Sequence, residues 1–190
     1  MRRVIHKLFW IWQLDKEEDW INEMARHGYS LVHTGKLLNY EYEETEADLY
    51  KYRTLFLKGS YNSRKNQDYL RFLEEMGIKT VTHCGYPGTC CVYVRGLSSD
   101  FPDGLEIYSD IESRIGALKV MTGYMFLVIA MCLFCSYINY WSAFLPGNYI
   151  SWLNLVLAVG MTVLFIAAVV ATIKMFIQIS KLKKERAIHE

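Results

Sequence analysis

Charged and apolar residues divide the chain into a mixed N-terminal part and an uncharged C-terminal stretch. No Asp, Glu, Lys or Arg occurs in the 54 consecutive residues 120–173. Roughly 20 apolar residues in a helix cross the hydrocarbon core of a bilayer, about 30 Å thick, so this stretch is long enough for two crossings. Turn-forming residues interrupt it near its middle: Asn139, Pro146, Gly147 and Asn148. The pattern predicts a hairpin of two transmembrane helices, at about residues 120–138 and 150–173.

Positive charges lie at the two outer ends of this hairpin, and none lies in the segment that connects its helices. They are Arg114, Lys119, Lys174, Lys181, Lys183, Lys184 and Arg186. Because flanking segments rich in Lys and Arg stay in the cytoplasm, we expect a two-span protein of the cell membrane with both termini cytoplasmic. Residues 174–190 are then a basic cytoplasmic tail. Aromatic residues of the kind that settle at lipid headgroups cluster around the turn: Tyr137, Tyr140, Trp141, Tyr149 and Trp152.

Before the hairpin, the spacing of apolar residues predicts an alternation of strands and helices. Residues 4–14 are dense in aliphatic and aromatic residues and favour a strand. Asp15 begins a helix, because Glu18 completes a capping box with it and Gly28 is suited to the helix end. Two more strands are expected, at residues 29–33 and 37–43.

The same order of elements then follows a second time. The expected elements are a strand at 49–58, a helix at 64–76, and strands at 78–83 and 90–95. A shift of 49 positions places Trp20 on Tyr69 and Gly28 on Gly77. We therefore predict an α+β domain over residues 1–97, built from two strand–helix–strand–strand repeats with a mainly antiparallel sheet. The alternative is that two amphipathic helices resemble each other by chance.

Residues 98–119 join this domain to the hairpin as a linker and juxtamembrane helix. Ser109 and Glu112 form a capping-box pattern, so a helix should begin there and run into the first span. A continuous helix would couple the domain to the bilayer, whereas Gly116 could act as a hinge.

The net charge and the lack of several known motifs argue against two classes of function, nucleic-acid binding and enzyme activity. A formal net charge of +1 at pH 7 excludes a protein that binds nucleic acid by broad charge neutralisation. The chain has no phosphate-binding glycine loop, nucleophile elbow or H-E-x-x-H helix. We interpret Glu17 and Glu18 as helix-start carboxylates stabilised by the helix dipole, not as an acid–base pair. We therefore expect neither enzyme activity nor a cofactor.

The cysteines raise the question of a metal or redox site. Metal-ligating side chains gather at His83, Cys84, Cys90 and Cys91. Because neighbours on a strand point to opposite faces, Cys90 and Cys91 cannot easily reach one ion, and we expect no metal site. A C-x-x-C pair at Cys132 and Cys135 lies inside the first span, where hydrocarbon suppresses thiolate formation and apolar packing is the better interpretation.

Aromatic and arginine side chains of the predicted strands are the candidate ligand-binding residues. They are Trp10, Trp12, Tyr40, Tyr42, Tyr52, Arg53, Tyr93 and Arg95. Duplicated strand–helix–strand–strand domains elsewhere bind small apolar or cationic ligands between their repeats, which is an analogy at the level of the fold. The competing interpretation is aromatic core packing, because each ring buries a large area.

Two other features suggest partners besides the bilayer. The segment from Glu41 to Asp48 is acidic and is either a solvated hairpin or a docking surface for a basic protein. Small residues at Gly160, Ala167 and Ala171 would let helices approach closely, which suggests a homo-oligomer through the spans. We expect no direct contact with nucleic acid.

Several short strings of residues are similar to those of a known family. They are Glu18 to Ala25, Gly28 to Leu31, Tyr50 to Arg53, Tyr69 and Leu70 with Gly77, Val92 to Arg95, and Glu112 to Arg114. Over nearly its whole length the chain resembles the domain of unknown function 2812 family. Departures are Tyr29, where the family more often has Trp, and Cys90 and Cys91, which replace aromatic or aliphatic residues. The resemblance implies a soluble domain before one or two membrane helices, and an association with PadR-like transcriptional regulators, but no activity.

These observations favour a membrane-anchored, non-enzymatic sensor or adaptor. Its cytoplasmic domain would bind a protein or small-molecule partner and be linked to a PadR-type regulator. The alternative is a structural membrane component that oligomerises through its spans and is involved in envelope stress.

Overall fold

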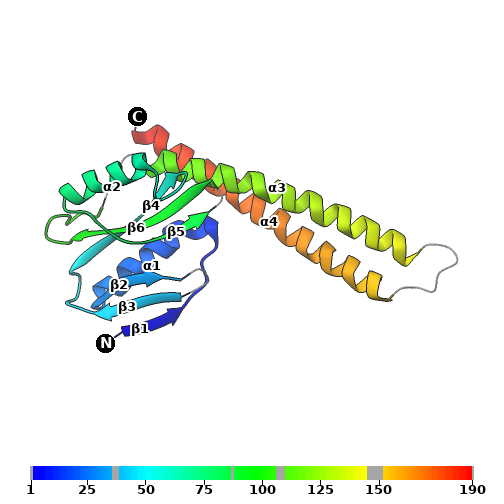
Figure 1. The fold of residues 1–190 in the computed structure, drawn as a ribbon, viewed down its shortest axis with the longest axis horizontal. Coiled ribbons are helices and arrows are strands. Elements are labelled where there is room, and N and C mark those ends of the chain that lie inside the picture. The colour runs from blue at the N-terminus through cyan, green and yellow to red at the C-terminus, as the bar shows by residue number, and fades with distance from the viewer. Residues whose placement is uncertain (1, 36–38, 87, 106–109, 145–151, 190) are drawn as a thin grey trace. The chain divides into compact units, whose positions relative to one another are not determined.

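The structure is a computed structural model, and it describes residues 2–35, 39–86, 88–105, 110–144 and 152–189 (Figure 1). The chain divides into two compact units, Met1–Ala117 and Leu118–Glu190. Outside the described residues lie the predicted turn at Pro146, Gly147 and Asn148, Ser109 of the predicted second capping box, and the predicted strand start at residue 37.

Each half of the first unit has the order strand, helix, strand, strand. The first half contains β1 (Arg2–His6), α1 (Leu14–Arg26), β2 (Tyr29–Thr34) and β3 (Asn39–Glu44), and the second contains β4 (Tyr50–Lys58), α2 (Arg64–Glu75), β5 (Lys79–Tyr86) and β6 (Thr89–Leu97). The strands form two antiparallel three-stranded sheets, in the orders β1-β3-β2 and β4-β6-β5. The predicted α+β fold with a repeated strand–helix–strand–strand unit is confirmed.

Glycine follows both helices of the repeat, as the sequence predicts. Gly28 and Gly77 have φ angles of +82° and +86°, and the amide of Gly28 donates to the carbonyl of Ala25 at 3.0 Å. This left-handed conformation costs a residue with a Cβ atom roughly 1–2 kcal/mol. Glycine therefore lets the chain leave each helix and enter the next strand directly.

The N-terminal strand is shorter than predicted. β1 ends at His6, and a short 3-10 helix, η1 (Ile11–Gln13), precedes α1. Between them the chain leaves the sheet, and Phe9 packs on Trp20 of α1 with ring centroids 5.5 Å apart. Phe9 is therefore explained by packing on a helix and not by a longer strand, while Leu8 and Trp10 are exposed.

The start of α1 also differs from the prediction. The helix begins at Leu14, and no side chain caps its first amide groups. The predicted capping box of Asp15 and Glu18 is therefore wrong. Glu18 instead accepts hydrogen bonds from Arg53 and Arg114, and charged donors form stronger hydrogen bonds than a backbone amide does.

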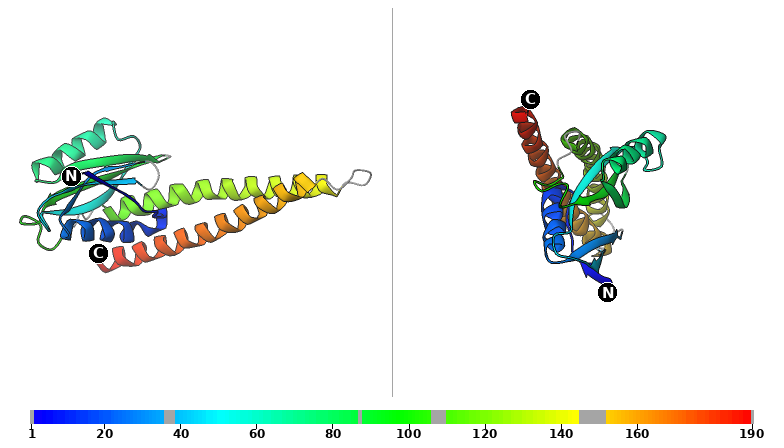
Figure 2. Two further views of the ribbon diagram at one scale, coloured as in Figure 1. Left: turned by 90° about the horizontal axis from the view of Figure 1, so that it is seen from below. Right: turned by 90° about the vertical axis from the view of Figure 1, so that its left-hand side faces the viewer.

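The second sheet is buried on both of its faces. Phe56 of β4 belongs to the core cluster that contains Ile21 of α1, whereas Leu55 belongs to the cluster that contains Leu73 of α2. Successive residues of a strand point to opposite faces, so β4 and β6 contribute to both clusters. Figure 2 (left) shows these strands between α1, in blue, and α2, in teal.

Two long apolar helices follow. They are α3 (Asp110–Ala143) and α4 (Trp152–His189). Within the second unit, the ring centroids of Phe126 and Phe176 are 6.3 Å apart, and the hydroxyl of Thr122 donates to Sδ of Met175 at 3.8 Å. The predicted hairpin of two apolar helices is confirmed, and each helix is long and apolar enough to cross a membrane.

Candidate functional site

A cavity of about 640 Å³ lies between the two halves of the first unit. It is lined by Lys7, Leu8, Phe9, Glu17, His33, Thr34, Gly35, Tyr40, His83, Cys84, Gly85, Tyr86 and Tyr93. The edge strands β2 and β5 meet beside it, where Nδ1 of His33 lies 3.3 Å from Oγ1 of Thr82. Both repeats therefore contribute to the cavity, and neither repeat encloses it alone.

Glu17 of α1 is the central polar group of the cavity wall. The hydroxyls of Tyr40 and Tyr93, from β3 and β6, donate to its Oε1 at 2.7 and 2.6 Å. Burial raises the pKa of both tyrosines, so they remain protonated donors. Glu17 is 8% exposed, and no Lys, Arg or His of the described residues forms an ion pair with it. Both hydroxyls bind the same oxygen of Glu17, and no hydrogen bond from the described residues reaches its other oxygen, Oε2.

Two aromatic residues of the cavity wall, Phe9 and Tyr40, pack against Trp20 of α1. Trp20 lies edge-on to Tyr40 with ring centroids 4.9 Å apart and is tilted against Phe9. The ammonium nitrogen of Lys7 lies 4.4 Å from the ring centroid of Trp20 and 5.1 Å from that of Phe9. Aromatic faces attract cations through their quadrupole. This part of the wall already accommodates one ammonium group.

β5 supplies the thiol of Cys84 and the imidazole of His83 to the cavity, and β2 supplies the imidazole of His33. His83 stacks on Tyr61 with ring centroids 3.8 Å apart, and Cys84 is half-buried. Cys90 and Cys91 of β6 lie on opposite faces, as predicted, because Cys91 belongs to the core cluster of α1 and Cys90 to that of α2. Among the described residues, no group of three or more His, Cys, Asp or Glu side chains is placed to hold a metal ion.

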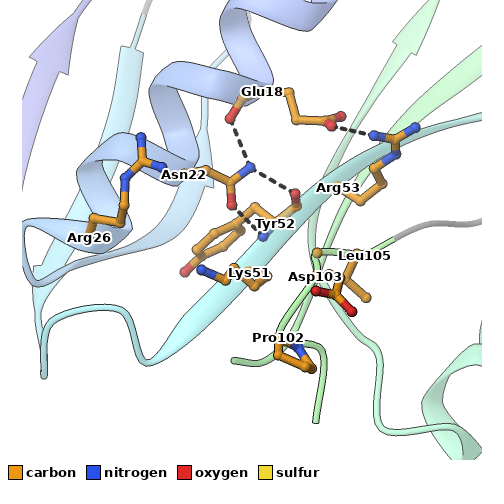
Figure 3. Close-up of a pocket in the computed structure, with 10 residues that line it drawn as sticks. Glu18, Asn22, Arg26, Lys51, Tyr52, Arg53, Pro102, Asp103 and Leu105 are labelled. Carbon is orange, nitrogen blue, oxygen red and sulfur yellow. Dashed lines mark hydrogen bonds and ion pairs between the residues drawn. The ribbon is translucent and has the colours of Figure 1, made fainter. Parts of the chain in front are cut away.

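The neighbouring carboxylate, Glu18, lies in a second pocket of about 260 Å³ (Figure 3). Its Oε1 accepts a hydrogen bond from Nη1 of Arg53 at 2.7 Å. Its Oε2 accepts from Nη2 of Arg114 at 2.6 Å and from the amide of Thr54 at 3.1 Å. Two guanidinium groups neutralise Glu18, whereas Glu17 has no such partner. We therefore assign Glu18 a structural role.

Side chains of α1 and α3 also form hydrogen bonds with the backbone at the outer edge of β4. As the end strand of its sheet, β4 directs the backbone groups of Tyr52 and Thr54 away from β6. Asn22 donates to the carbonyl of Tyr52 at 3.0 Å and accepts from its amide at 2.8 Å (Figure 3). The carbonyl of Thr54 accepts from Arg114 at 3.1 Å. The backbone groups of β4 at Tyr52 and Thr54 are thus paired, which blunts this part of the sheet edge.

Arg114 fixes the beginning of α3 within the first unit. The residue is 4% exposed, and its Nη1 lies 3.1 Å from Oδ1 of Asp15. With its bonds to Glu18 and Thr54, it joins α3 to α1 and β4. A buried guanidinium needs such a set of partners, because leaving it unpaired costs several kcal/mol.

The predicted ligand residues do not form one site. Tyr40 and Tyr93 meet at the cavity beside Glu17, and Arg53 lines the smaller pocket. Trp10 and Trp12 stack on each other with ring centroids 5.2 Å apart, and Trp10 is 52% exposed. The tryptophans line neither of these two pockets.

The other predicted residues have structural contacts. Tyr42 is completely buried in the core cluster of α1. Tyr52 accepts a hydrogen bond at its hydroxyl from the amide of Leu31 at 3.0 Å, although the residue also lines the smaller pocket. Arg95 donates to the hydroxyl of Ser30 at 2.8 Å and lies 4.3 Å above the ring centroid of Tyr50. Core packing accounts for Tyr42, and hydrogen bonds with residues of β2 hold Tyr52 and Arg95.

Sequence reasoning missed Glu17 and Glu18 as site residues. Both are buried on α1, together with Leu14, Ile21 and Ala25. These five positions have the spacing of one helical face, so two carboxylates lie on an otherwise apolar stripe. These two carboxylates on an apolar helix face are the sequence feature from which the site could have been predicted.

One comparison places the chain in a family. No curated protein and no solved structure matches the chain. The profile of the family described as "Protein of unknown function (DUF2812)" matches residues 13–131, which include α1, both sheets except β1, and much of α3. The match covers more than half of the chain. The chain therefore belongs to the DUF2812 family.

Proposed function

We propose that the chain is a membrane-anchored, non-enzymatic sensor or adaptor whose first unit binds a small organic cation in the cavity at Glu17. One observation carries this proposal: a carboxylate that is 8% exposed, bound by two hydroxyls on one oxygen, without a cationic partner among the described residues. Burying an uncompensated charge costs several kcal/mol. A positively charged ligand would offset that cost at the free oxygen.

The size and lining of the cavity support the same ligand class. Its volume of about 640 Å³ falls within the range of roughly 300–1,000 Å³ that is usual for small-molecule sites. The rings of Phe9, Tyr40 and Tyr93, which line the cavity, offer apolar contact and cation–π attraction, worth about 0.5–2 kcal/mol. Lys7 already places an ammonium group against the rings of Phe9 and Trp20, and its exposed side chain can withdraw.

The proposed membrane anchor is the hairpin of α3 and α4, whose apolar surface would lie in contact with lipid. Only 22% and 17% of the most apolar stretches of these helices are buried within the structure. Leu127 and Met131 are each 63% exposed, and such a surface is unfavourable in water. The basic residues at both outer ends support cytoplasmic termini, with the turn outside.

The output of the sensor would pass to a protein partner. The resemblance to a family associated with PadR-like regulators supports a regulator of that type. The acidic segment Glu41 to Asp48 is the proposed docking surface for a basic partner, since Glu44, Glu46 and Asp48 are exposed and give this surface a negative charge. The absence of known catalytic motifs in the sequence supports the non-enzymatic role.

The second candidate function is a structural component that oligomerises through its spans. Gly160 and Ala167 are both exposed on α4 and lie seven residues apart, so they share one side of the helix. Cross-linking in native membranes tests this candidate. A defined homo-oligomer that persists after deletion of residues 1–104 would support it, whereas a monomer would contradict it.

Calorimetric titration of the full chain in detergent micelles tests the ligand proposal. The ligand is phenyltrimethylammonium, and its neutral isostere tert-butylbenzene is the comparison. We expect Glu17→Gln to weaken binding at least about tenfold, which corresponds to about 1.4 kcal/mol. The matched control is Glu23→Gln, which removes an exposed carboxylate from the same helix and should leave the Kd unchanged. Equal affinity for the neutral isostere, an unchanged Kd in Glu17→Gln, or no binding by the wild-type chain would contradict the proposal.

A further inference from the structure

Two thiols meet at the wall of the cavity. Cys84 of β5 and Cys91 of β6 are directly opposite each other in the antiparallel register. Opposite residues of this kind point to the same face, with Cα atoms about 4.5–5.5 Å apart. A disulfide requires a Cα separation of about 4.4–6.8 Å. The backbone therefore already holds the two residues at a distance that a disulfide can bridge.

The two thiols differ in access. Cys84 is half-buried and lines the cavity. Cys91 is 1% exposed and belongs to the core cluster. A small molecule that enters the cavity thus meets Cys84, while Cys91 is reached through its contact with Cys84.

Local contacts also make Cys84 the better nucleophile. Its hydrogen bond with Cys91 is the main cause that lowers the pKa of Cys84, and Tyr86 adds to this against the opposing effect of burial. Burial raises the pKa of Cys91, which therefore remains a protonated donor. Since the thiolate is the reactive form of cysteine, Cys84 should react first.

We propose that Cys84 and Cys91 form a reactive dithiol in the cavity wall, which small hydroperoxides oxidise to a disulfide. The proposal goes beyond ligand binding, because the reaction requires neither an organic cation nor the charge of Glu17. It assigns the cavity a modification site whose substrate class is the hydroperoxides.

The reaction has two steps. The sulfur of Cys84 attacks one oxygen of the hydroperoxide, so that an S–O bond forms and the O–O bond breaks. The leaving alkoxide takes the proton of the Cys84 thiol and departs as an alcohol, or as water from hydrogen peroxide. The sulfur of Cys91 then attacks the sulfenic sulfur, so that the S–S bond forms and the S–O bond breaks. The hydroxide takes the proton of Cys91 and leaves as water, so two electrons pass from the dithiol to the peroxide.

The disulfide would act on the proposed ligand site through the same strands. Tyr93 lies two residues beyond Cys91 on the same face of β6 and donates to Glu17 at 2.6 Å. A disulfide removes the thiol proton of Cys91, a neighbour of Tyr93, and fixes the side chain of Cys84 in the cavity wall. Oxidation is therefore expected to change the affinity of the cavity for a ligand.

Peptide mapping by mass spectrometry of the full chain tests the proposal. The chain, in detergent micelles, is treated with hydrogen peroxide, and the remaining thiols are alkylated. We expect a disulfide between Cys84 and Cys91, while Cys90, Cys132 and Cys135 remain reduced. In Cys91→Ser the sulfenic acid of Cys84 should accumulate and react with dimedone. The control Cys90→Ser removes a buried thiol from the same strand and should leave the rate of disulfide formation unchanged.

Several results would overturn the proposal. Oxidation of Cys84 no faster than that of Cys90, a disulfide with another pairing, or a sulfenic acid on Cys84 that persists in the wild-type chain would each do so. The wild-type mapping requires no variant to fold. The Glu17→Gln variant separates the two proposals, because it should lose affinity for the cation and still form the disulfide. The rate should be no lower than in the wild-type chain, since the charge of Glu17 raises the pKa of Cys84.

Discussion

Replacement of Arg114 by methionine removes its guanidinium group and tests whether the first turns of α3 are held in the first unit. In Arg114→Met, Glu18 loses one of its two guanidinium partners and the carbonyl of Thr54 loses its donor. Breaking a buried ion pair costs about 3–5 kcal/mol, and an unpaired buried carbonyl costs about 1–3 kcal/mol. Asp15 is 57% exposed, so its share is about 0–1 kcal/mol.

These contributions do not add fully, because Glu18 keeps Arg53 as a partner. We therefore expect Arg114→Met to lower the free energy of unfolding of the first unit by about 3 kcal/mol, at the low end of the range for buried pairs. Methionine keeps most of the apolar stem of arginine, so the loss reports mainly on the guanidinium contacts.

Pulse proteolysis of the full chain in urea and detergent measures this change. The matched control is Arg2→Met, because Arg2 pairs with Glu43 at the surface, where the two side chains are 68% and 46% exposed. The control should leave stability nearly unchanged, because solvent screens an exposed ion pair. An Arg114→Met chain no less stable than the Arg2→Met chain would refute the assignment of Arg114 as a buried link between α1, β4 and α3.

Three other predictions concern stability and thiol chemistry. Tyr42→Phe should change the free energy of unfolding little, because the Tyr42 hydroxyl has no hydrogen-bond partner among the described residues. Tyr52→Phe should lower the free energy of unfolding by about 1–3 kcal/mol, because the Tyr52 hydroxyl bonds the Leu31 amide and the Ser30 hydroxyl. Urea unfolding measures both changes. Phe56→Ala should cost about 3–5 kcal/mol in the same assay, since Phe56 is 1% exposed; a loss under 1 kcal/mol would contradict the core described. Iodoacetamide should alkylate Cys84 at lower pH than Cys90, because hydrogen bonding lowers the pKa of Cys84 and burial raises that of Cys90; the reverse order would contradict this.

The fold could be predicted from local sequence patterns. Alternating strands, the apolar face of each helix, and glycines at positions 28 and 77 specify the repeated unit, because each feature acts within a few residues. The same reasoning failed for residues 7–14, which do not continue β1 and in which Phe9 packs on Trp20. Periodicity alone does not separate a strand from an apolar segment that packs on a helix.

The candidate site could be predicted only in part. Tyr40 and Tyr93 were expected as ligand residues, but their common partner Glu17 was assigned to the helix dipole. The hydrogen bond from Tyr93 spans 76 residues of sequence, and no local pattern predicts such a contact. Arg114 was interpreted only as a flanking charge, although it also pairs with Glu18 on α1. Pairing between polar groups that are far apart in the sequence depends on the tertiary structure, which the spacing of residues along the chain does not predict.

The central claim is that Glu17 provides the uncompensated charge of a ligand cavity. Native mass spectrometry of the full chain, released from micelles with phenyltrimethylammonium present, tests it most directly. With the cation at a concentration near the Kd of the wild-type chain, we predict one bound cation on the wild-type chain and on Glu23→Gln, and a much smaller bound fraction on Glu17→Gln. A wild-type chain without bound cation, or a Glu17→Gln chain that binds as large a fraction, would contradict the account.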